Sequence, residues 1–440
     1  MGTAVTSTLI FQVVDWLSAS FGEAIERETL ASLRITAGAE SIPVTEVDDT
    51  LAHTVRSHIN VPAYALARWL VVNWWRLRWE PFRASPSVDW LQAHSMAAIG
   101  GDYAWPALQL ASDGEFVQLK LEAESAPDVS TLRYLRNITV DIPASHFEQA
   151  VDSFLDQVEA RVAARIPSEH ELSEIRAELG QERRVPMQAT ACRLQALAGI
   201  DASSASQEWM NGAEALAAVA GSVAVEEILA TVPDLRDGLN TANAAVSAMQ
   251  QSPTTVTVDW AANGRTSPLN KEVPWERGTR LAAEVRAKIG LPSGPLSKRS
   301  LEDLLNTKLP LAKSTWTGGR GLSGGYRNGH DGGRTALLVT NNREDNQRFF
   351  LARVIAAAVI NPTDQHVLAV SDAATALQKI ERAFAQEFLC PWKELDEFTK
   401  ENGIDDDGIA DAADHFTVSE QVVRTTLVNK GKLPRDRLLA

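Results

Sequence analysis

The sequence predicts an α+β protein of more than one domain. Its 440 residues exceed what one hydrophobic core usually organises, so we expect two or three domains. The composition, 45% hydrophobic and 22% charged, is ordinary for a folded chain. Apolar and polar residues alternate at 115–123 and again at 134–140, and helical spacing follows at 145–162. These patterns indicate two antiparallel strands with an amphipathic helix packed on them.

The first domain is expected over residues 1–166, and it contains a tryptophan-rich segment at 66–82 that predicts one helix ended by a proline. Trp and Arg side chains are interleaved along this segment. Such a helix can stack on nucleobases or form the centre of a protein interface, so Trp74, Trp75 and Trp79 are candidate partner contacts. Because the segment is apolar nearly all round, core packing is the alternative interpretation.

The rest of the chain predicts a helical section, a linker and a second domain. Residues 167–249 are rich in Ala, Glu and Leu with helical periodicity, and the polar, turn-rich stretch 250–273 predicts a linker. The second domain is expected at 274–440. Its predicted elements are helices at 275–289, 300–305, 347–360 and 372–389, a glycine-rich stretch at 317–334, a strand at 335–340 and a terminal helical pair at 409–430.

Charge and cysteine usage bear on location and partners. A net charge of −15 disfavours unspecific binding to nucleic acid or to anionic membranes. No apolar stretch reaches the length that spans a bilayer, and the first residues lack the basic segment and cleavage site of a secretory signal. Cys192 and Cys390 belong to no metal-binding or disulfide pattern, which suits a reducing compartment. We therefore expect a cytoplasmic protein without a membrane partner.

Five segments of the second domain follow one another in the order of one protein family. They are PWERGTRLAAEVRAKIGLP at 274–292, GLSGG at 321–325, GGRTALLVTNNREDNQRFFLA at 332–352, IERAFAQEFLCP at 380–391 and DHFTVSEQVVRTTLVNKGKL at 414–433. Together they resemble the ImmA/IrrE family, the zincin-like peptidases of bacteria and their phages. The resemblance covers roughly residues 274–435 and implies a zincin-like α+β fold for this domain.

The motif that would carry catalysis departs from the family pattern. Active members continue R-F-x-L-A with H-E-x-x-H, in which two histidines one helical turn apart bind zinc and the glutamate is the general base. Here RFFLA continues with RVIAA, so Arg353 and Ala357 replace the histidines and Val354 replaces the base. The resemblance therefore implies a pseudo-peptidase with no catalytic residue, no bound metal and no other cofactor.

Arg353 lies in a segment that is otherwise almost wholly apolar, so a buried guanidinium there needs a carboxylate or several carbonyl acceptors. The resemblance places the third, acidic zinc ligand within 378–381, with the alignment ambiguous between those positions. We predict an Arg353–Glu381 ion pair in the space of the lost zinc. The alternative is that the charged end of Arg353 reaches the surface while its stem stays buried.

Two other metal sites are weaker alternatives. A zinc site with new ligands would combine His330 or His366 with Glu381. The segment 403–414 has the aspartate spacing of a calcium loop, but it begins with Gly and ends with Asp where such loops have Glu. An acidic helix start explains these aspartates more simply.

The glycine-rich stretch 317–334 carries Arg320, Arg327 and His330, and a loop of this kind can cradle phosphate. No GK[ST] follows it, which excludes a P-loop. Beside a peptidase-like groove these three residues are candidate partner contacts, and a mobile loop before the next strand is the alternative.

The terminal helical pair has helix-turn-helix spacing, with Arg424 and Lys430 as candidate DNA contacts beside many acidic residues. Structural closure of the peptidase-like fold is the alternative. Altogether we expect a non-catalytic, peptidase-like regulatory protein that binds a partner protein, in bacterial stress response, toxin–antitoxin or phage-defence regulation. The contexts come from the resemblance alone. A zinc metallopeptidase with an atypical metal site and a DNA-binding transcriptional regulator are the alternative functions.

Overall fold

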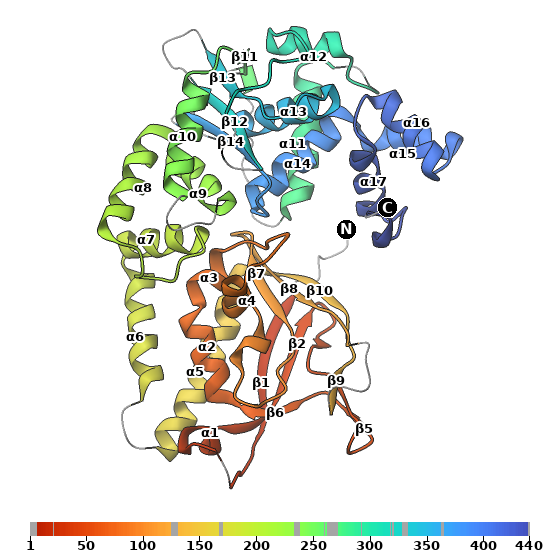
Figure 1. The fold of residues 1–440 in the computed structure, drawn as a ribbon. Coiled ribbons are helices and arrows are strands. Elements are labelled where there is room, and N and C mark those ends of the chain that lie inside the picture. The colour runs from red at the N-terminus through yellow and green to blue at the C-terminus, as the bar shows by residue number, and fades with distance from the viewer. Residues whose placement is uncertain are drawn as a thin grey trace. The chain divides into compact units, whose positions relative to one another are not determined.

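The computed structural model describes residues 7–20, 22–124, 131–166, 170–232, 238–258, 260–261, 272–291, 293–316, 318, 321–327, 333–361 and 365–438. The chain divides into two compact units, Met1–Ser206 (unit 1) and Gln207–Ala440 (unit 2). Both contain helices and antiparallel sheets, so the predicted α+β fold is confirmed (Figure 1). Within the described ranges, no helix is both long enough and apolar enough to cross a membrane.

The described part of unit 1 contains three antiparallel sheets. They consist of β1 (Thr8–Trp16), β2 (Leu30–Gly38), β3 (Ile42–Pro43) and β6 (Ile59–Pro62); of β7 (Gln109–Ser112), β8 (Phe116–Leu121) and β10 (Ile138–Pro143); and of β4 (Val47–Asp49), β5 (Thr54–Arg56) and β9 (Leu132–Tyr134). The strand predicted at 115–123 is β8. The pattern at 134–140 is only partly a strand, because a loop separates β9 from β10, held by a hydrogen bond from Leu135 N to Glu46 O.

Helices pack on these sheets as the apolar spacing predicts. They are α1 (Ala24–Glu28), α2 (Ala63–Val72), α3 (Trp74–Trp79), α4 (Val88–His94), the 3-10 turn η1 (Met96–Ile99), α5 (Ala144–Arg165), α6 (Glu171–Arg184) and α7 (Pro186–Leu197). The amphipathic helix predicted at 145–162 is α5, whose Phe154 ring lies 5.5 Å from that of Phe11 on β1. This contact joins the longest helix of unit 1 to the sheet in one hydrophobic core.

The tryptophan-rich segment is two helices rather than the predicted single one. α2 ends at Val72 and α3 begins at Trp74. Between them, the side-chain amide of Asn73 donates to Trp69 O at 2.9 Å, so the side chain competes with the helix for that carbonyl. The break lets the two halves meet different parts of the core, since α2 contacts α5 and α6 while α3 contacts α4 and α7.

The boundaries between the parts of the chain differ from those predicted. The helical section expected at 167–249 is divided, because α6 and α7 belong to unit 1 while α8 (Gln207–Ala220), α9 (Ser222–Thr231) and α10 (Gly238–Gln250) belong to unit 2. The linker expected at 250–273 contains β11 (Thr255–Thr257), which pairs with β13. Val256 is buried in the core of unit 2, so this part of the stretch is structural and not a linker.

Unit 2 is built on a four-stranded antiparallel sheet of order β11-β13-β12-β14, which adds β12 (Leu322–Arg327), β13 (Arg334–Leu338) and β14 (Val367–Ser371) to β11. β12 lies inside the glycine-rich stretch for which a mobile loop was the alternative, so that part is a central strand. Its glycines fit the close packing of the sheet, because a Cβ on Gly324 would lie 2.5 Å from Leu368 O. The strand predicted at 335–340 is β13.

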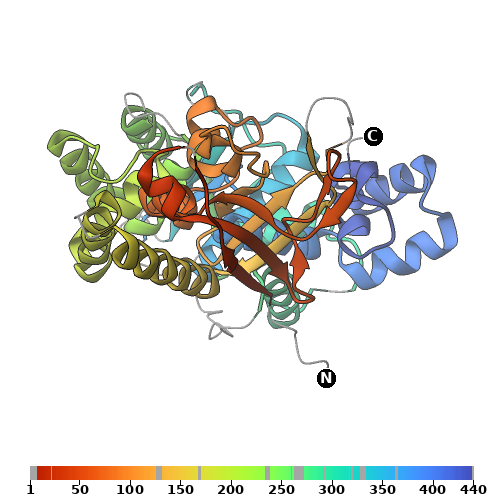
Figure 2. The same cartoon turned by 90° about the horizontal axis from the view of Figure 1, so that it is seen from below.

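The helices within residues 274–440, the predicted second domain, follow the predicted order with one addition. They are α11 (Pro274–Lys288), α12 (Lys298–Leu305), α13 (Glu344–Ile360), α14 (Ala376–Leu389), α15 (Trp392–Asn402), α16 (Asp406–Phe416), α17 (Glu420–Asn429) and the 3-10 turn η3 (Arg435–Leu438). The sequence analysis missed α15; α15, α16 and α17 gather in blue in Figure 2. Gly278 fixes the packing of α11 on α14, because a Cβ there would lie 2.3 Å from Ile380 O.

Buried arginines tie the helix ends of unit 2 together. Arg286 donates to Phe388 O near the end of α14, and Arg327 donates to Ala358 O near the end of α13. Helix C-termini have unpaired carbonyls and a negative dipole end, so guanidinium groups are stabilised there. These contacts hold α13 and α14, the two helices on which the candidate site depends, in fixed positions.

Candidate functional site

The positions at which the resemblance expects the zinc motif all lie in the interior of unit 2. Arg353, Val354 and Ala357 are on α13 and all three are buried. Glu381 on α14, within the range where the resemblance places the third zinc ligand, is buried as well. Glu227 on α9 is a second buried glutamate near it. We define the polar centre as five side chains: Arg353, Glu381, Glu227, Gln378 of α14 and Thr375, the N-cap of α14.

One guanidinium nitrogen of Arg353, Nη2, has three hydrogen-bond acceptors around it. Its Nη2 donates to Ser371 O at 2.6 Å, to Gln378 Oε1, and to Glu381 Oε2 at 3.4 Å. The predicted contact between Arg353 and Glu381 is therefore present. Only 6% of Arg353 is exposed, so the alternative in which its charged end reaches the surface is wrong. The guanidinium is held in the interior of unit 2 by acceptors from α14 and the end of β14.

Gln378 connects α14 to the end of β14. Its Oε1 accepts from Ser371 N at 2.9 Å, and its Nε2 donates to Ala369 O at 3.1 Å and to Glu381 Oε1 at 3.4 Å. One amide side chain thus satisfies groups of the strand, the arginine and the glutamate at the same time. Such a polar network fixes the side chains that it joins, although the buried Nε of Arg353 has no partner in it.

Glu227 reaches the polar centre from a distant part of the sequence. The hydroxyl of Thr375, which caps α14, donates to Glu227 Oε2 at 2.7 Å. Glu227 was not predicted from the sequence, because α9 is about 150 residues away from α14 along the chain and only tertiary contact reveals the pairing. The two adjacent glutamates, Glu226 and Glu227, among the mainly apolar residues of α9 are the signal that could have drawn attention to it.

Burial controls the charge of these carboxyls. Burial raises the pKa of Glu381 to about 8, against the attraction of Arg353. Burial also raises the pKa of Glu227 to about 7, against hydrogen bonds from Thr375 and Gln378. Burial therefore favours the protonated form of Glu381, and the predicted ion pair with Arg353, at 3.4 Å, strengthens as the pH rises.

The residues present do not fit a zinc ion. Arg353 carries a permanent positive charge, and Val354 and Ala357 have no atom that can bind a metal or take a proton. In the described ranges, no three His, Cys, Asp or Glu residues are grouped so that they could hold a metal ion. Of the alternative ligands, His330 lies outside the described residues and His366 stacks on Tyr326, with ring centroids 6.0 Å apart.

The aspartates of the calcium-like segment begin a helix. The side chain of Asp405 accepts a hydrogen bond from Gly408 N at 3.0 Å and so caps α16. Acidic residues in the first turn of a helix are stabilised by its free amides and dipole. The simpler interpretation of this segment is the one that the structure supports.

Of the four candidate partner contacts that the structure describes, three are buried and one is half-buried. Trp74 and Trp75 are buried in the core of unit 1, and Trp79 is half-buried between Arg78 and Arg193. Core packing, the alternative interpretation of this segment, is therefore what the structure has. Arg327 on β12 is buried, and its guanidinium donates to Ala358 O near the end of α13. The other two candidates of the glycine-rich stretch, Arg320 and His330, lie outside the described residues.

The candidate DNA contacts are occupied by other groups. Arg424 is buried and forms ion pairs with Asp406 at 3.0 Å and Glu420 at 3.3 Å. Lys430 is exposed, and its ammonium lies 5.7 Å from the ring centroid of Trp392. An arginine that is already neutralised by two carboxylates has little charge to offer to a phosphate, so these helices lack the basic face of a DNA reader.

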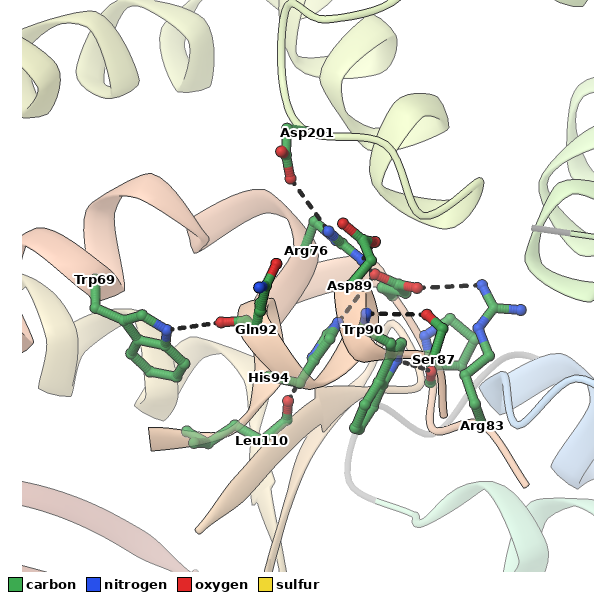
Figure 3. Close-up of polar contacts among 12 residues, drawn as sticks. Trp69, Arg76, Arg83, Ser87, Asp89, Trp90, Gln92, His94, Leu110 and Asp201 are labelled. Carbon is green, nitrogen blue, oxygen red and sulfur yellow. Dashed lines mark hydrogen bonds and ion pairs between the residues drawn. The ribbon is translucent and has the colours of Figure 1, made fainter. Parts of the chain in front are cut away.

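A second buried polar cluster lies in unit 1, around Glu80 at the end of α3. Its carboxylate accepts from Arg76 at 2.8 Å, from Arg83 at 3.2 Å and from His94 at 2.9 Å. Figure 3 shows Arg76 reaching on to Asp89 and Asp201, at 2.9 and 3.2 Å. Burial alone would raise the pKa of Glu80, but the bonds and charges of His94 and the arginines outweigh it, so the pKa lies below its usual value.

His94 has an acceptor at each ring nitrogen. Nδ1 lies 2.6 Å from Leu110 O, Nε2 lies 2.9 Å from the carboxylate of Glu80, and the ring stacks on Trp90 (Figure 3). Both ring nitrogens are therefore engaged by acceptors within the cluster. A histidine without a free nitrogen cannot act as a base toward a substrate, so this cluster holds α3, α4 and β7 together.

Comparison of the chain with protein-family models, with curated proteins and with solved structures gives no match.

Proposed function

We propose that this protein is a non-catalytic, peptidase-like binding protein that recognises a partner protein. The observation that carries the proposal is the position of Arg353: its guanidinium donates to Ser371 O and to the side chains of Gln378 and Glu381, in the part of the fold where the resemblance expects a metal. A scaffold that keeps a peptidase-like order of elements without the chemistry is suited to binding.

The chemistry of the replaced residues supports the non-catalytic half of the proposal. Metal-assisted hydrolysis needs a Lewis acid, a water that it activates, and a base that accepts the proton. A guanidinium repels a cation, and the apolar side chains of Val354 and Ala357 accept no proton. The remaining carboxyl, Glu381, is occupied by Arg353 and Gln378.

The biological setting belongs to the proposal and rests on the resemblance. We place the protein in the bacterial cytoplasm, where the family's members regulate stress responses, toxin–antitoxin systems or phage defence. The pairing of the candidate DNA contacts with acidic residues favours a protein partner over DNA.

A cleavage assay tests the non-catalytic half. The full chain is incubated with an unfolded protein substrate, with added zinc and separately with a chelator. We expect no cleavage that the chelator abolishes. Cleavage that the chelator stops, and that Glu381→Gln also removes, would overturn the proposal in favour of a metallopeptidase with an atypical site.

Native mass spectrometry tests the partner half. The chain is purified gently from cells that produce it at a low level, and we expect a stoichiometric complex with a second protein. A chain that is always found alone, or only with copies of itself, would contradict recognition of a partner protein.

A further inference from the structure

Three helices of unit 2, α8, α9 and α10, contact one another and form a layer on the sheet, which we call the cap. Their buried side chains, which include Trp209, Val225, Ile228 and Val246, are not part of the core cluster around α13 and α14. In Figure 1, α9 and α10 lie beside the strands, where α9 contacts β14 and α10 contacts β12 and β13. Contiguous layers of this kind often open as one cooperative unit.

Polar contacts attach α9 to the rest of unit 2. Thr375 Oγ1 donates to Glu227 Oε2 at 2.7 Å, and Val223 N donates to Gln365 Oε1 at 3.1 Å. The second contact depends on Gly221, which has a φ of +99° and whose Cβ, if present, would lie 2.2 Å from Gln365 Oε1. The cap is therefore fastened at the start of β14 and at the polar centre.

Glu227 is the titratable group of this attachment. The groups that act on its carboxyl are Glu226 on α9 itself, Arg353 on α13, and Thr375, Gln378, Glu381 and Arg382 at the N-cap and along α14. β14 and α10 carry no titratable side chain, and those of α8, Glu208 and Glu214, are exposed. The carboxyl of Glu227 thus lies at the contact between the cap and the polar centre, where its protonation state can affect that contact.

We infer that the cap is a regulatory cover of the polar centre, that it opens as a unit, and that the proton on Glu227 keeps it closed. This inference adds regulation to the proposed binding site and rests on that proposal for its biological role. A partner can reach the part of β14 that α9 covers only when the cap is open.

The direction of the pH effect follows from the two states of the carboxyl. Burial gives Glu227 a pKa of about 7 in the closed cap, whereas in water the ordinary value is 4.5. Between these values the closed cap holds a proton that the open cap has lost. The opening constant therefore rises by about tenfold per pH unit in this window and becomes level at higher pH, where both states are ionised.

Hydrogen exchange of the full chain between pH 5 and about pH 8, corrected for intrinsic exchange rates, measures this opening. We expect the amides of α8–α10 to exchange through a smaller opening than those of α13, and their protection to fall by about tenfold per pH unit up to about pH 7. Equal protection of the cap and α13 would show that they unfold together and would overturn the inference.

Substitutions on one helix separate Glu227 from a general charge effect. Glu227→Gln is expected to remove one proton from the pH dependence of cap opening, whereas the neighbouring Glu226→Gln leaves it. A wild-type slope in Glu227→Gln would overturn the inference. If Glu227→Gln does not fold, the wild-type profile and Thr375→Val, which removes the hydroxyl donor and should increase cap opening, still decide. These exchange results do not depend on metal or cleavage, so their failure is distinct from failure of the proposed function.

Discussion

The two buried polar clusters of this protein solve the same problem in opposite ways. In unit 1, Glu80 is surrounded by Arg76, Arg83 and His94, and the pKa of its carboxyl lies below the usual value. In unit 2, burial outweighs the arginine contact of Glu381 and raises the pKa of its carboxyl to about 8. Three donor side chains surround Glu80, whereas Glu381 has one arginine at hydrogen-bond distance and a second carboxyl, Glu227, that raises its pKa further.

This comparison assigns different roles to the clusters. In the cluster around Glu80, the charges of the arginines and the carboxylate neutralise one another, which is typical of an interaction that stabilises the fold. The polar centre holds neutral acids that can release protons near physiological pH, which is typical of a place where a state can change. Substitutions at the two clusters should therefore differ in size and in pH dependence.

The largest effect is expected for Glu80→Gln. This change leaves Arg76, Arg83 and His94 without their shared carboxylate, and breaking a buried charge cluster costs about 3–5 kcal/mol. Hydrogen exchange of α4 measures the free energy of opening of unit 1. The matched control is Glu171→Gln, whose pair with Arg68 is exposed and is worth at most about 1 kcal/mol. Equal effects of the two changes would contradict the assigned role of Glu80.

A smaller effect is expected for Arg353→Met. The substitution removes the Arg353 donor from Ser371 O and Gln378 Oε1, which costs about 1–3 kcal/mol, although Gln378 Oε1 still accepts from Ser371 N. It leaves no buried charge while Glu381 is protonated. Exchange of the β14 and α14 amides at pH 6 measures this loss. A loss as large as that of Glu80→Gln would show that Glu381 is ionised and that the two clusters are alike.

The smallest effect at neutral pH is expected for Glu381→Gln, within about 1 kcal/mol, because an amide replaces an acid that is mainly neutral. Its effect lies in the pH profile. The folded pKa of about 8 exceeds the ordinary 4.5, so the stability that this proton contributes is lost as pH rises between these values. Urea unfolding followed by fluorescence between pH 5 and about pH 9 should show a shallower loss in Glu381→Gln. An unchanged profile would contradict the raised pKa.

The opposite sign is expected in unit 1. Because the folded pKa of Glu80 is lowered, its contribution to stability is present above the ordinary value and is lost as pH falls through the folded value. The opening constant of α4, obtained from exchange corrected for intrinsic rates, should therefore increase in acid, while that of unit 2 decreases. An increase of both opening constants in acid would contradict the difference between the clusters.

Periodicity and burial made parts of this structure predictable. The apolar spacing of α5 and the alternation of β8 are local signals, and both elements lie where the sequence places them. The contact between Arg353 and Glu381 followed from two arguments: a cation in an apolar helix must find acceptors, and the resemblance places an acidic residue within 378–381. The sequence also indicated an α+β fold, because strand and helix patterns followed one another in separate stretches.

Other parts depend on contacts that no local pattern shows. β12 was missed because its glycines are typical of a loop, and the close approach of Leu368 O that requires one of them is visible only in the sheet. The role of Glu227 depends on a hydrogen bond to Thr375 on a distant helix. The charge of Glu381 depends on the balance between burial and one arginine, which residue spacing does not give.

Zinc content tests most directly the claim that the polar centre replaces a metal site. The full chain, purified without a histidine tag, is analysed for zinc by elemental analysis before and after treatment with a chelator, and its folding is followed by circular dichroism. The account predicts far less than one zinc per chain and an unchanged spectrum after the chelator. Zinc near one per chain, lost together with the folded spectrum, would contradict it.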